Sequence, residues 1–107
     1  MKIDVLGAEY TLTVIRGSKE PRLKDCDGFC DETTKEMLVE NYEDSKGEPN
    51  CKQNLLVQTN KVKRHEIIHA FLFESGLAEN SSWAQNEEMV DFFAIFDQHL
   101  FRSFITE

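Results

Sequence analysis

Residues 64–76 read Arg-His-Glu-Ile-Ile-His-Ala-Phe-Leu-Phe-Glu-Ser-Gly, and this stretch decides the fold that we expect. Within it, residues 67–73 are all apolar except His69. The apolar spacing predicts a long helix over about residues 51–75, with Gly76 as the residue that ends it. Because this run has no broad polar face, we expect the helix to be buried on almost all sides.

The chain before this helix is rich in apolar and β-branched residues that predict strands, separated by polar segments with Gly and Pro. We expect two antiparallel hairpins. Residues 1–6 pair with 9–15 around Gly7-Ala8, and residues 28–31 pair with 35–40 around a turn at 32–34. The remaining segments, 16–27 and 41–50, are expected to be loops.

A second helix is expected after a short linker at residues 80–82. It should run from about Trp83 or Ala84 to Ser103 and bury one apolar stripe, made of Phe93, Phe96, Leu100 and Phe104. Three more apolar residues, Phe92, Ile95 and Phe101, widen that stripe, so this helix is a candidate surface for a homodimer or a partner. Strands followed by helices predict one α+β domain over residues 1–107.

The composition excludes several classes of protein. The 107 residues include 20 acidic and 12 basic side chains, a formal net charge of −8, so we expect no nucleic-acid partner. No apolar run approaches the roughly 20 residues that span a bilayer, and no signal peptide is evident, so we expect a cytoplasmic protein outside the membrane. The odd number of cysteines, Cys26, Cys30 and Cys51, favours free thiols in a reducing compartment.

The segment His65-Glu66-Ile67-Ile68-His69 carries the most chemical information. Residues i and i+4 of a helix share one face, so His65 and His69 can present two imidazole nitrogens to one metal ion. Glu66 can reach a water on that metal without being a ligand, and zinc lowers the pKa of such a water toward about 7. The alternative is a pair of hydrogen-bonded core histidines, which is disfavoured because burying these groups without a ligand is costly.

A catalytic zinc site needs a third protein ligand, and the second expected helix offers carboxylates for it. Glu87 shares a helical face with Val90 and Asp91, so its side chain should point toward the first helix. Asp91 could accept the other ring N–H of a ligating histidine. Glu88, about 100° away around the helix, is the second choice for the third ligand. Alternatively, these acidic residues only stabilise a helix N-terminus.

Together these two segments resemble the gluzincin metallopeptidases, the thermolysin-like group. In that group, His-Glu-x-x-His is followed by a helix with Asn-Glu-x-x-x-Asp, which is Asn86-Glu87-x-x-x-Asp91 here. The small size, Gly28-x-Cys30-Asp31 before a short strand, and His-Glu-Ile-Ile-His-Ala-Phe-Leu are similar to small metallopeptidase-like proteins of phages and prophages. The chain is also similar to minimal single-domain gluzincins of about this length.

This resemblance implies a zincin-like minimal domain that cleaves a peptide or protein substrate, in the cytoplasm of a bacterial host. Zinc (Zn²⁺) would be bound by His65, His69 and Glu87. Glu66 would be the general base, and Asp91 would orient a histidine. The resemblance also implies that an edge strand beside the active-site helix pairs with the extended substrate, and we assign that role to residues 35–40.

The chain departs from larger gluzincins, which carry an oxyanion-stabilising histidine or tyrosine in a second subdomain. The aromatic donors in this sequence are His99, Tyr42, Tyr10 and Trp83, and none lies in a recognisable motif. We therefore keep two functions open. One is a zinc-dependent peptidase, and the other is a catalytically weak or inactive zinc-binding protein that acts as an interaction module. A domain without metal would require both helix motifs to be coincidental.

Overall fold

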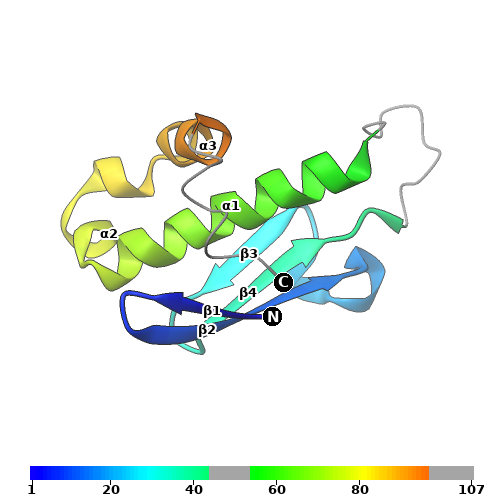
Figure 1. Ribbon diagram of the computed structural model, residues 1–107, viewed down its shortest axis with the longest axis horizontal. Coiled ribbons are helices and arrows are strands. Elements are labelled where there is room, and N and C mark those ends of the chain that lie inside the picture. The colour runs from blue at the N-terminus through cyan, green and yellow to red at the C-terminus, as the bar shows by residue number, and fades with distance from the viewer. Residues whose placement is uncertain (44–53, 97–107) are drawn as a thin grey trace.

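The computed structural model describes residues 1–43 and 54–96. Within these ranges, four strands and three α-helices follow in the order β1 (Lys2–Val5), β2 (Ala8–Ile15), β3 (Gly28–Asp31), β4 (Glu36–Glu40), α1 (Leu55–Glu74), α2 (Leu77–Asn80) and α3 (Glu87–Phe96). Figure 1 shows α1 lying across one face of the sheet, with α3 on the side of α1 away from the sheet. The expected α+β class is confirmed. None of the described helices has the length and apolar content needed to cross a membrane.

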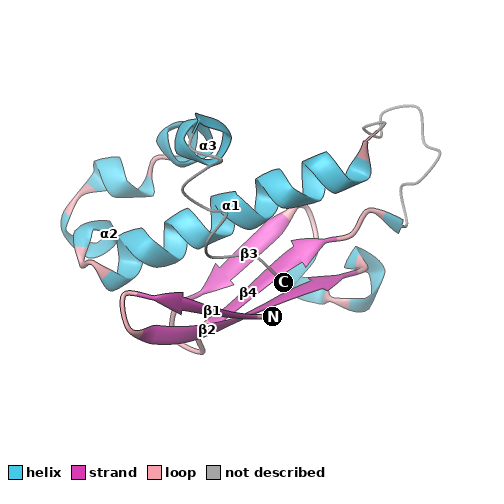
Figure 2. Ribbon diagram, in the orientation of Figure 1, coloured by secondary structure: helices cyan, strands magenta, loops and turns pink. Residues whose placement is uncertain are grey.

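The sheet is mixed, with the strand order β1-β2-β4-β3 (Figure 2). Both expected hairpins are confirmed: β1 pairs antiparallel with β2, and β3 pairs antiparallel with β4. The sequence analysis missed the parallel pairing of β2 with β4, which sets Leu12 beside Met37 and joins the hairpins into one sheet.

This pairing corrects the assignment of residues 35–40 to an edge strand. Strand β4 is hydrogen-bonded on both sides, and β3 is the edge strand that lies nearest α1 on that side of the sheet. The physical reason is visible in the sequence of β4, where three consecutive residues, Met37, Leu38 and Val39, are all buried. A continuous apolar run of this kind is typical of an interior strand.

The hydrophobic core fills the space between the sheet and α1 and continues to α3. Alternate residues of the strands point inward, as a period of two requires. The core consists of Ile3, Val5, Tyr10, Leu12, Met37 and Val39 from the sheet, Val62, Ile67, Ile68 and Ala70 from α1, and Val90 and Ala94 from α3.

The ends of α1 follow from local capping. Asn54 has extended backbone angles, and its side chain accepts a hydrogen bond from the Val57 amide at 3.1 Å, so the helix begins at residue 55 rather than near 51. After Ser75 the chain turns at Gly76, whose φ of 86° lies in the left-handed region that glycine adopts without strain. The predicted C-terminal stop is confirmed.

The expectation that α1 is buried on almost all sides was wrong. Leu56 and Val57, in the first turn, are 70% and 61% exposed. The helix is covered by the sheet on one side and by α3 on another, so side chains on its remaining surface face solvent.

The second predicted helix begins later than expected. Residues 82–85 form a separate 3-10 turn, and α3 begins at Glu87 because the Asn86 side chain accepts a hydrogen bond from the Met89 amide at 2.8 Å. The expected end of this helix, residues 97–103, lies outside the described residues.

The apolar stripe expected on this helix was partly wrong. Val90 and Ala94 are fully buried against α1, while Phe93 is 39% exposed. Because α3 packs on α1 through these two small residues, Phe92 and Phe93 lie on its outer faces. Phe92 and Ile95, which were expected to widen the apolar stripe, are exposed. Leu100, Phe101 and Phe104, with the Phe96 side chain, lie outside the described part of the chain.

Candidate metal centre

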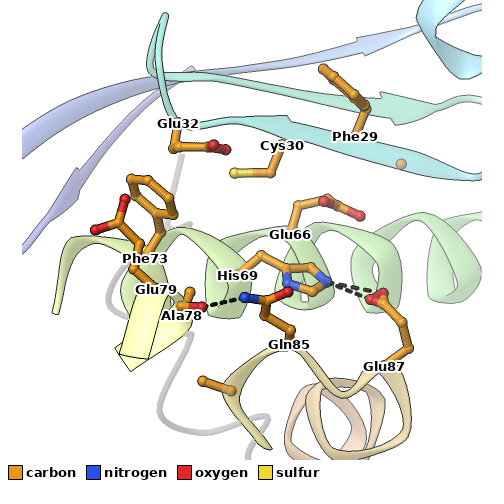
Figure 3. Close-up of a pocket in the computed structure, with 12 residues that line it drawn as sticks. Phe29, Cys30, Glu32, Glu66, His69, Phe73, Ala78, Glu79, Gln85 and Glu87 are labelled. Carbon is orange, nitrogen blue, oxygen red and sulfur yellow. Dashed lines mark hydrogen bonds and ion pairs between the residues drawn. The ribbon is translucent and has the colours of Figure 1, made fainter. Parts of the chain in front are cut away.

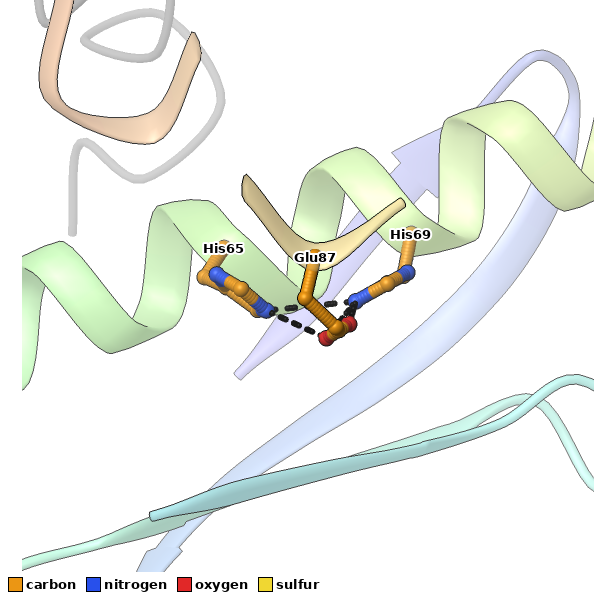
Figure 4. A group of neighbouring side chains, drawn as sticks. All are labelled: His65, His69 and Glu87. Carbon is orange, nitrogen blue, oxygen red and sulfur yellow. Dashed lines mark hydrogen bonds and ion pairs between the residues drawn. The ribbon is translucent and has the colours of Figure 1, made fainter. Parts of the chain in front are cut away.

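Three side chains from two helices converge at the contact between α1 and α3 (Figure 4). The two histidine Nε2 atoms, of His65 and His69, lie 3.2 Å apart. The Oε1 atom of Glu87 lies 3.2 Å from the first of these nitrogens and 3.1 Å from the second. Within the described residues, this is the one group of three or more side chains that could hold a metal ion.

Local structure explains how these atoms meet. The histidines are one helical turn apart on α1, so their rings project from the same face. Glu87 is the first residue of α3, and its position is set by the burial of Val90 and Ala94 against α1. Arg64 adds a direct link between the helices, because its Nε donates a hydrogen bond to the Ala94 carbonyl oxygen.

The spacing of the three donor atoms fits tetrahedral zinc. Zinc–nitrogen bonds of about 2.0–2.1 Å at tetrahedral angles place neighbouring ligand atoms about 3.3 Å apart. The observed separations of 3.1–3.2 Å among the His65, His69 and Glu87 atoms are close to that value. Two imidazole nitrogens and one carboxylate are also a donor set that zinc accepts in catalytic sites, with one position left for water.

A shared proton explains the short distance between the two imidazole nitrogens less well than a metal ion does. Two neutral rings cannot both accept at 3.2 Å, so one nitrogen must carry a proton or both must face a cation. Burial lowers the pKa of His69, although the charge of Glu87 opposes this effect. A neutral ring that carries its proton on Nε2 could donate to the other nitrogen or to Glu87, whereas a metal ion would satisfy all three groups at once.

Glu66 lies next to these donors but points to a different side of α1, toward β3. It is only 6% exposed, and it makes no hydrogen bond with any described residue. Burial, followed by the charge of Glu87, raises the pKa of Glu66 to about 8. A cation at the adjacent donors would favour its ionised form. No side-chain oxygen of a described residue is fully buried without a hydrogen-bond partner, so the Glu66 carboxylate faces open space in which a ligand can lie beside it.

Gly28 of β3 makes room for this carboxylate. A Cβ atom at residue 28 would lie 2.5 Å from Oε2 of Glu66 and 2.9 Å from Cγ1 of Val62. Both distances are shorter than van der Waals contact, so the strand can approach α1 this closely only with glycine. The sequence analysis used Gly28 only as the start of a strand, and no local signal in the sequence reveals this approach.

The remaining candidates differ in their placement. Asp91 Oδ1 lies 3.5 Å from Nδ1 of His65 and 3.8 Å from Nζ of Lys61, so it is in position to orient the histidine electrostatically. Glu88, the second choice for the third ligand, is exposed and lies outside the group of three donors.

Two hollows flank the donor group; the larger runs along the edge strand β3, and the smaller lies at the start of that strand, at Gly28. The larger, of about 460 Å³, is lined by His69 and reaches α2 (Figure 3), while the smaller, of about 250 Å³, is lined by His65. Gly28, Glu66 and Glu87 line both hollows. The Glu87 side chain is 65% exposed, so the donor group is accessible from solvent.

Of the four aromatic residues considered for the oxyanion role, the three that the structure describes line neither hollow. The Tyr10 hydroxyl is buried and donates to Glu74 at 2.7 Å, and the Tyr42 hydroxyl accepts a hydrogen bond from Gln58. Trp83 is 54% exposed, and His99 lies outside the described residues.

Other polar donors do line the hollows, and the sequence analysis missed them. Gln58 and Lys61 line the smaller hollow, and Gln85 lines the larger one. Gln58 and Lys61 precede His65 by seven and four positions, so helical periodicity could have placed them on its face.

The two cysteines that the structure describes are free thiols, as expected. Cys26 lines the smaller hollow and Cys30 the larger one. Burial and the charge of Glu66 raise the pKa of Cys30 to about 12, so it stays protonated and is a poor metal ligand near neutral pH. Cys51 lies outside the described residues.

No protein-family model, curated protein or solved structure matches this chain. Its function is therefore inferred from the geometry of the site.

Proposed function

We propose that this chain is a zinc-dependent metallopeptidase with a minimal zincin-like domain. The observation that carries the proposal is the combination of three donor atoms at tetrahedral spacing with a buried, unpartnered carboxylate beside them. His65, His69 and Glu87 would hold the metal. When bound, zinc would polarise the scissile carbonyl and lower the pKa of a water ligand.

The role of Glu66 follows from its position. Its carboxylate accepts a proton from the attacking water as the new carbon–oxygen bond forms. It then delivers that proton to the amine nitrogen as the carbon–nitrogen bond breaks. The space left by Gly28 keeps the carboxylate beside the histidines.

The edge strand β3 supports a peptide as the substrate. Among the described strands it pairs with β4 alone, and Gly28, Phe29 and Cys30 of this strand line the larger hollow. An extended peptide could add to its free edge through backbone hydrogen bonds, with side chains entering the hollows. Strand β3 thus takes the substrate-pairing role that the sequence analysis gave to residues 35–40.

The test compares wild type with Glu66→Gln, using zinc-loaded protein and a mixed peptide library analysed by mass spectrometry. Wild type should cut, and the variant should keep its zinc and lose at least about a hundredfold in rate. Loss of zinc in Glu66→Gln would contradict the role of Glu66 as a base that does not bind metal. Full activity in the variant would contradict the mechanism.

A zinc-stabilised interaction module is the second candidate, favoured by the exposed apolar side chains of α3. Phe92, Phe93 and Ile95 are 57%, 39% and 48% exposed, a surface that a second copy or a partner could cover. This function predicts that wild type cuts no peptide, and that Glu66→Gln binds any partner as wild type does. In either case the free thiols are compatible with a cytoplasmic location.

A further inference from the structure

We propose that the larger hollow is a subsite for a cationic substrate side chain, lysine or arginine, and this inference rests on the proposed peptidase function. The hollow begins at His69 and Glu66 and ends at two more carboxylates, Glu32 after β3 and Glu79 in α2 (Figure 3). A peptide held along β3 would direct one side chain into this space.

The carboxylates at the far end are available to a ligand. Neither Glu32 nor Glu79 forms an ion pair or a hydrogen bond with another described residue. Among the described residues that line the hollow, none carries a positive charge, whereas the smaller hollow contains Lys61. Lys35, which follows the same turn as Glu32, is held by Glu74 at 2.5 Å.

Apolar side chains form the walls between the metal centre and these carboxylates. Phe29, Phe73 and Ala78 line the hollow, so an aliphatic stem could be buried between them. Lysine and arginine combine such a stem with a charged head. The volume of about 460 Å³ lies within the usual range of small-ligand sites.

The electrostatic environment of Cys30 supports a preference for a positively charged ligand in this hollow. This thiol lines the hollow, and four carboxylates, Glu66, Glu32, Asp31 and Glu74, act with burial to raise its pKa to about 12. The same charges that disfavour a thiolate favour a cation in this space.

A second feature separates this hollow from an ordinary acidic surface. Glu66 is 6% exposed, lines the hollow, and has no hydrogen-bond partner among the described residues, which indicates a place for a ligand. Glu32 and Glu79 do not belong to the group of described residues that could hold a metal ion. An organic cation therefore fits their arrangement better than a second metal.

The experiment uses labelled hexapeptides of sequence Ala-Ala-X-Ala-Ala-Ala, where X is lysine, its uncharged analogue norleucine, or glutamate. Fluorescence anisotropy measures their affinity for zinc-loaded wild type and for Glu32→Gln, Glu79→Gln and the double variant. Glu9→Gln is the control, because Glu9 is an exposed carboxylate of β2 that lines neither hollow. Mass spectrometry measures cleavage in the same samples.

Wild type and Glu9→Gln should bind the lysine peptide about five- to tenfold more tightly than norleucine at low salt, and glutamate should bind worst. The preference should fall below about twofold in the double variant, with each single variant between, and it should weaken in 1 M salt. A second variant, Glu79→Lys, should favour the glutamate peptide.

Equal affinity for the lysine and norleucine peptides would overturn the subsite, and so would a preference that survives in the double variant. Binding and cleavage separate the two proposals. Cleavage without a lysine preference would overturn only the subsite. A lysine preference without cleavage would support the subsite as a binding site and overturn only the peptidase function.

Discussion

Two glutamates of helix α1 occupy opposite environments. Glu74, at the end of the helix, accepts hydrogen bonds from the Tyr10 hydroxyl at 2.7 Å and from the Lys35 ammonium at 2.5 Å. These partners hold the pKa of Glu74 below its ordinary value. Glu66, in the middle of the helix, has no such partner among the described residues, and burial raises its pKa to about 8.

The difference separates a carboxylate whose partners lie within the protein from one that faces the hollows beside the candidate metal centre. The cluster around Glu74 joins α1 to the turn before β4 and to β2, and every charge in it is matched within the protein. The Glu66 carboxylate instead opens into the two hollows, and its raised pKa shows that burial makes its ionised form less favourable. A fold retains such an unfavourable environment where a ligand or a reaction uses the group.

The largest effect is expected from filling the space beside Glu66. In Gly28→Ala the new Cβ atom would lie 2.5 Å from Oε2 of Glu66, so the carboxylate must move away from the histidines. Peptide hydrolysis should fall about a hundredfold or more, and the free energy of unfolding should fall by about 1–3 kcal/mol. Activity assays and urea unfolding measure the two effects.

Gly7→Ala is the matched control. Unlike Gly28, Gly7 has a positive φ, 90°, and a Cβ there meets nothing within 4 Å. This variant should lose about 1 kcal/mol of stability through backbone strain and keep its activity. If both variants kept full activity, the close approach of β3 to Glu66 would have no functional importance.

Zinc binding to His65, His69 and Glu87 should stabilise the fold. Zinc at about a hundred times its dissociation constant should stabilise wild type by about 2.7 kcal/mol, seen as a higher Tm in thermal unfolding. His65→Ala and Glu87→Ala should lose most of this stabilisation, while Glu66→Gln should keep it. A Tm that zinc leaves unchanged in wild type would be incompatible with a folded metal centre.

A smaller effect is expected at Asp91, whose carboxylate lies next to the ring of His65. Asp91→Asn removes the charge 3.5 Å from Nδ1 of His65 and should weaken zinc binding about tenfold in competition titrations with a chelator. Glu88→Gln, the neighbouring exposed carboxylate, should bind zinc as wild type does. Weaker zinc binding in Glu88→Gln with unchanged binding in Asp91→Asn would contradict the role of Asp91 and indicate that Glu88 acts on the metal instead.

The smallest effect is expected at Glu74, whose carboxylate is bound by Tyr10 and Lys35. The pKa of Glu74 is lowered on folding, so its ionised form stabilises the protein above its ordinary pKa of 4.5. That contribution is lost as pH falls through the lower pKa of the folded state. Glu74→Gln should be less stable than wild type by about 1 kcal/mol at pH 7. Unfolding experiments should show this difference shrinking below pH 4.5, with zinc content unchanged.

The local patterns of the sequence predicted much of this arrangement. The spacing of His65 and His69 is a property of one helix, and the face shared by Glu87, Val90 and Asp91 is a property of another. Because both are short-range features, the sequence analysis named all three residues that converge in the structure. The two hairpins were predicted for the same reason.

Features that depend on contacts between distant segments were missed. The parallel pairing of β2 with β4, which makes β3 the edge strand, joins segments separated by a long loop. The close approach of Gly28 to Glu66 is a tertiary contact without a local signal. Phe93 was placed in the core by periodicity alone, but α3 packs through the smaller Val90 and Ala94.

The most direct test of the metal centre is the zinc content of protein purified without a tag or chelator, measured by elemental mass spectrometry. The geometry of His65, His69 and Glu87 predicts about one zinc per chain in wild type, none in His65→Ala, and a reduced amount in Glu87→Ala. Wild type without bound metal, and with no uptake when zinc is added, would contradict the metal centre and the peptidase function that depends on it.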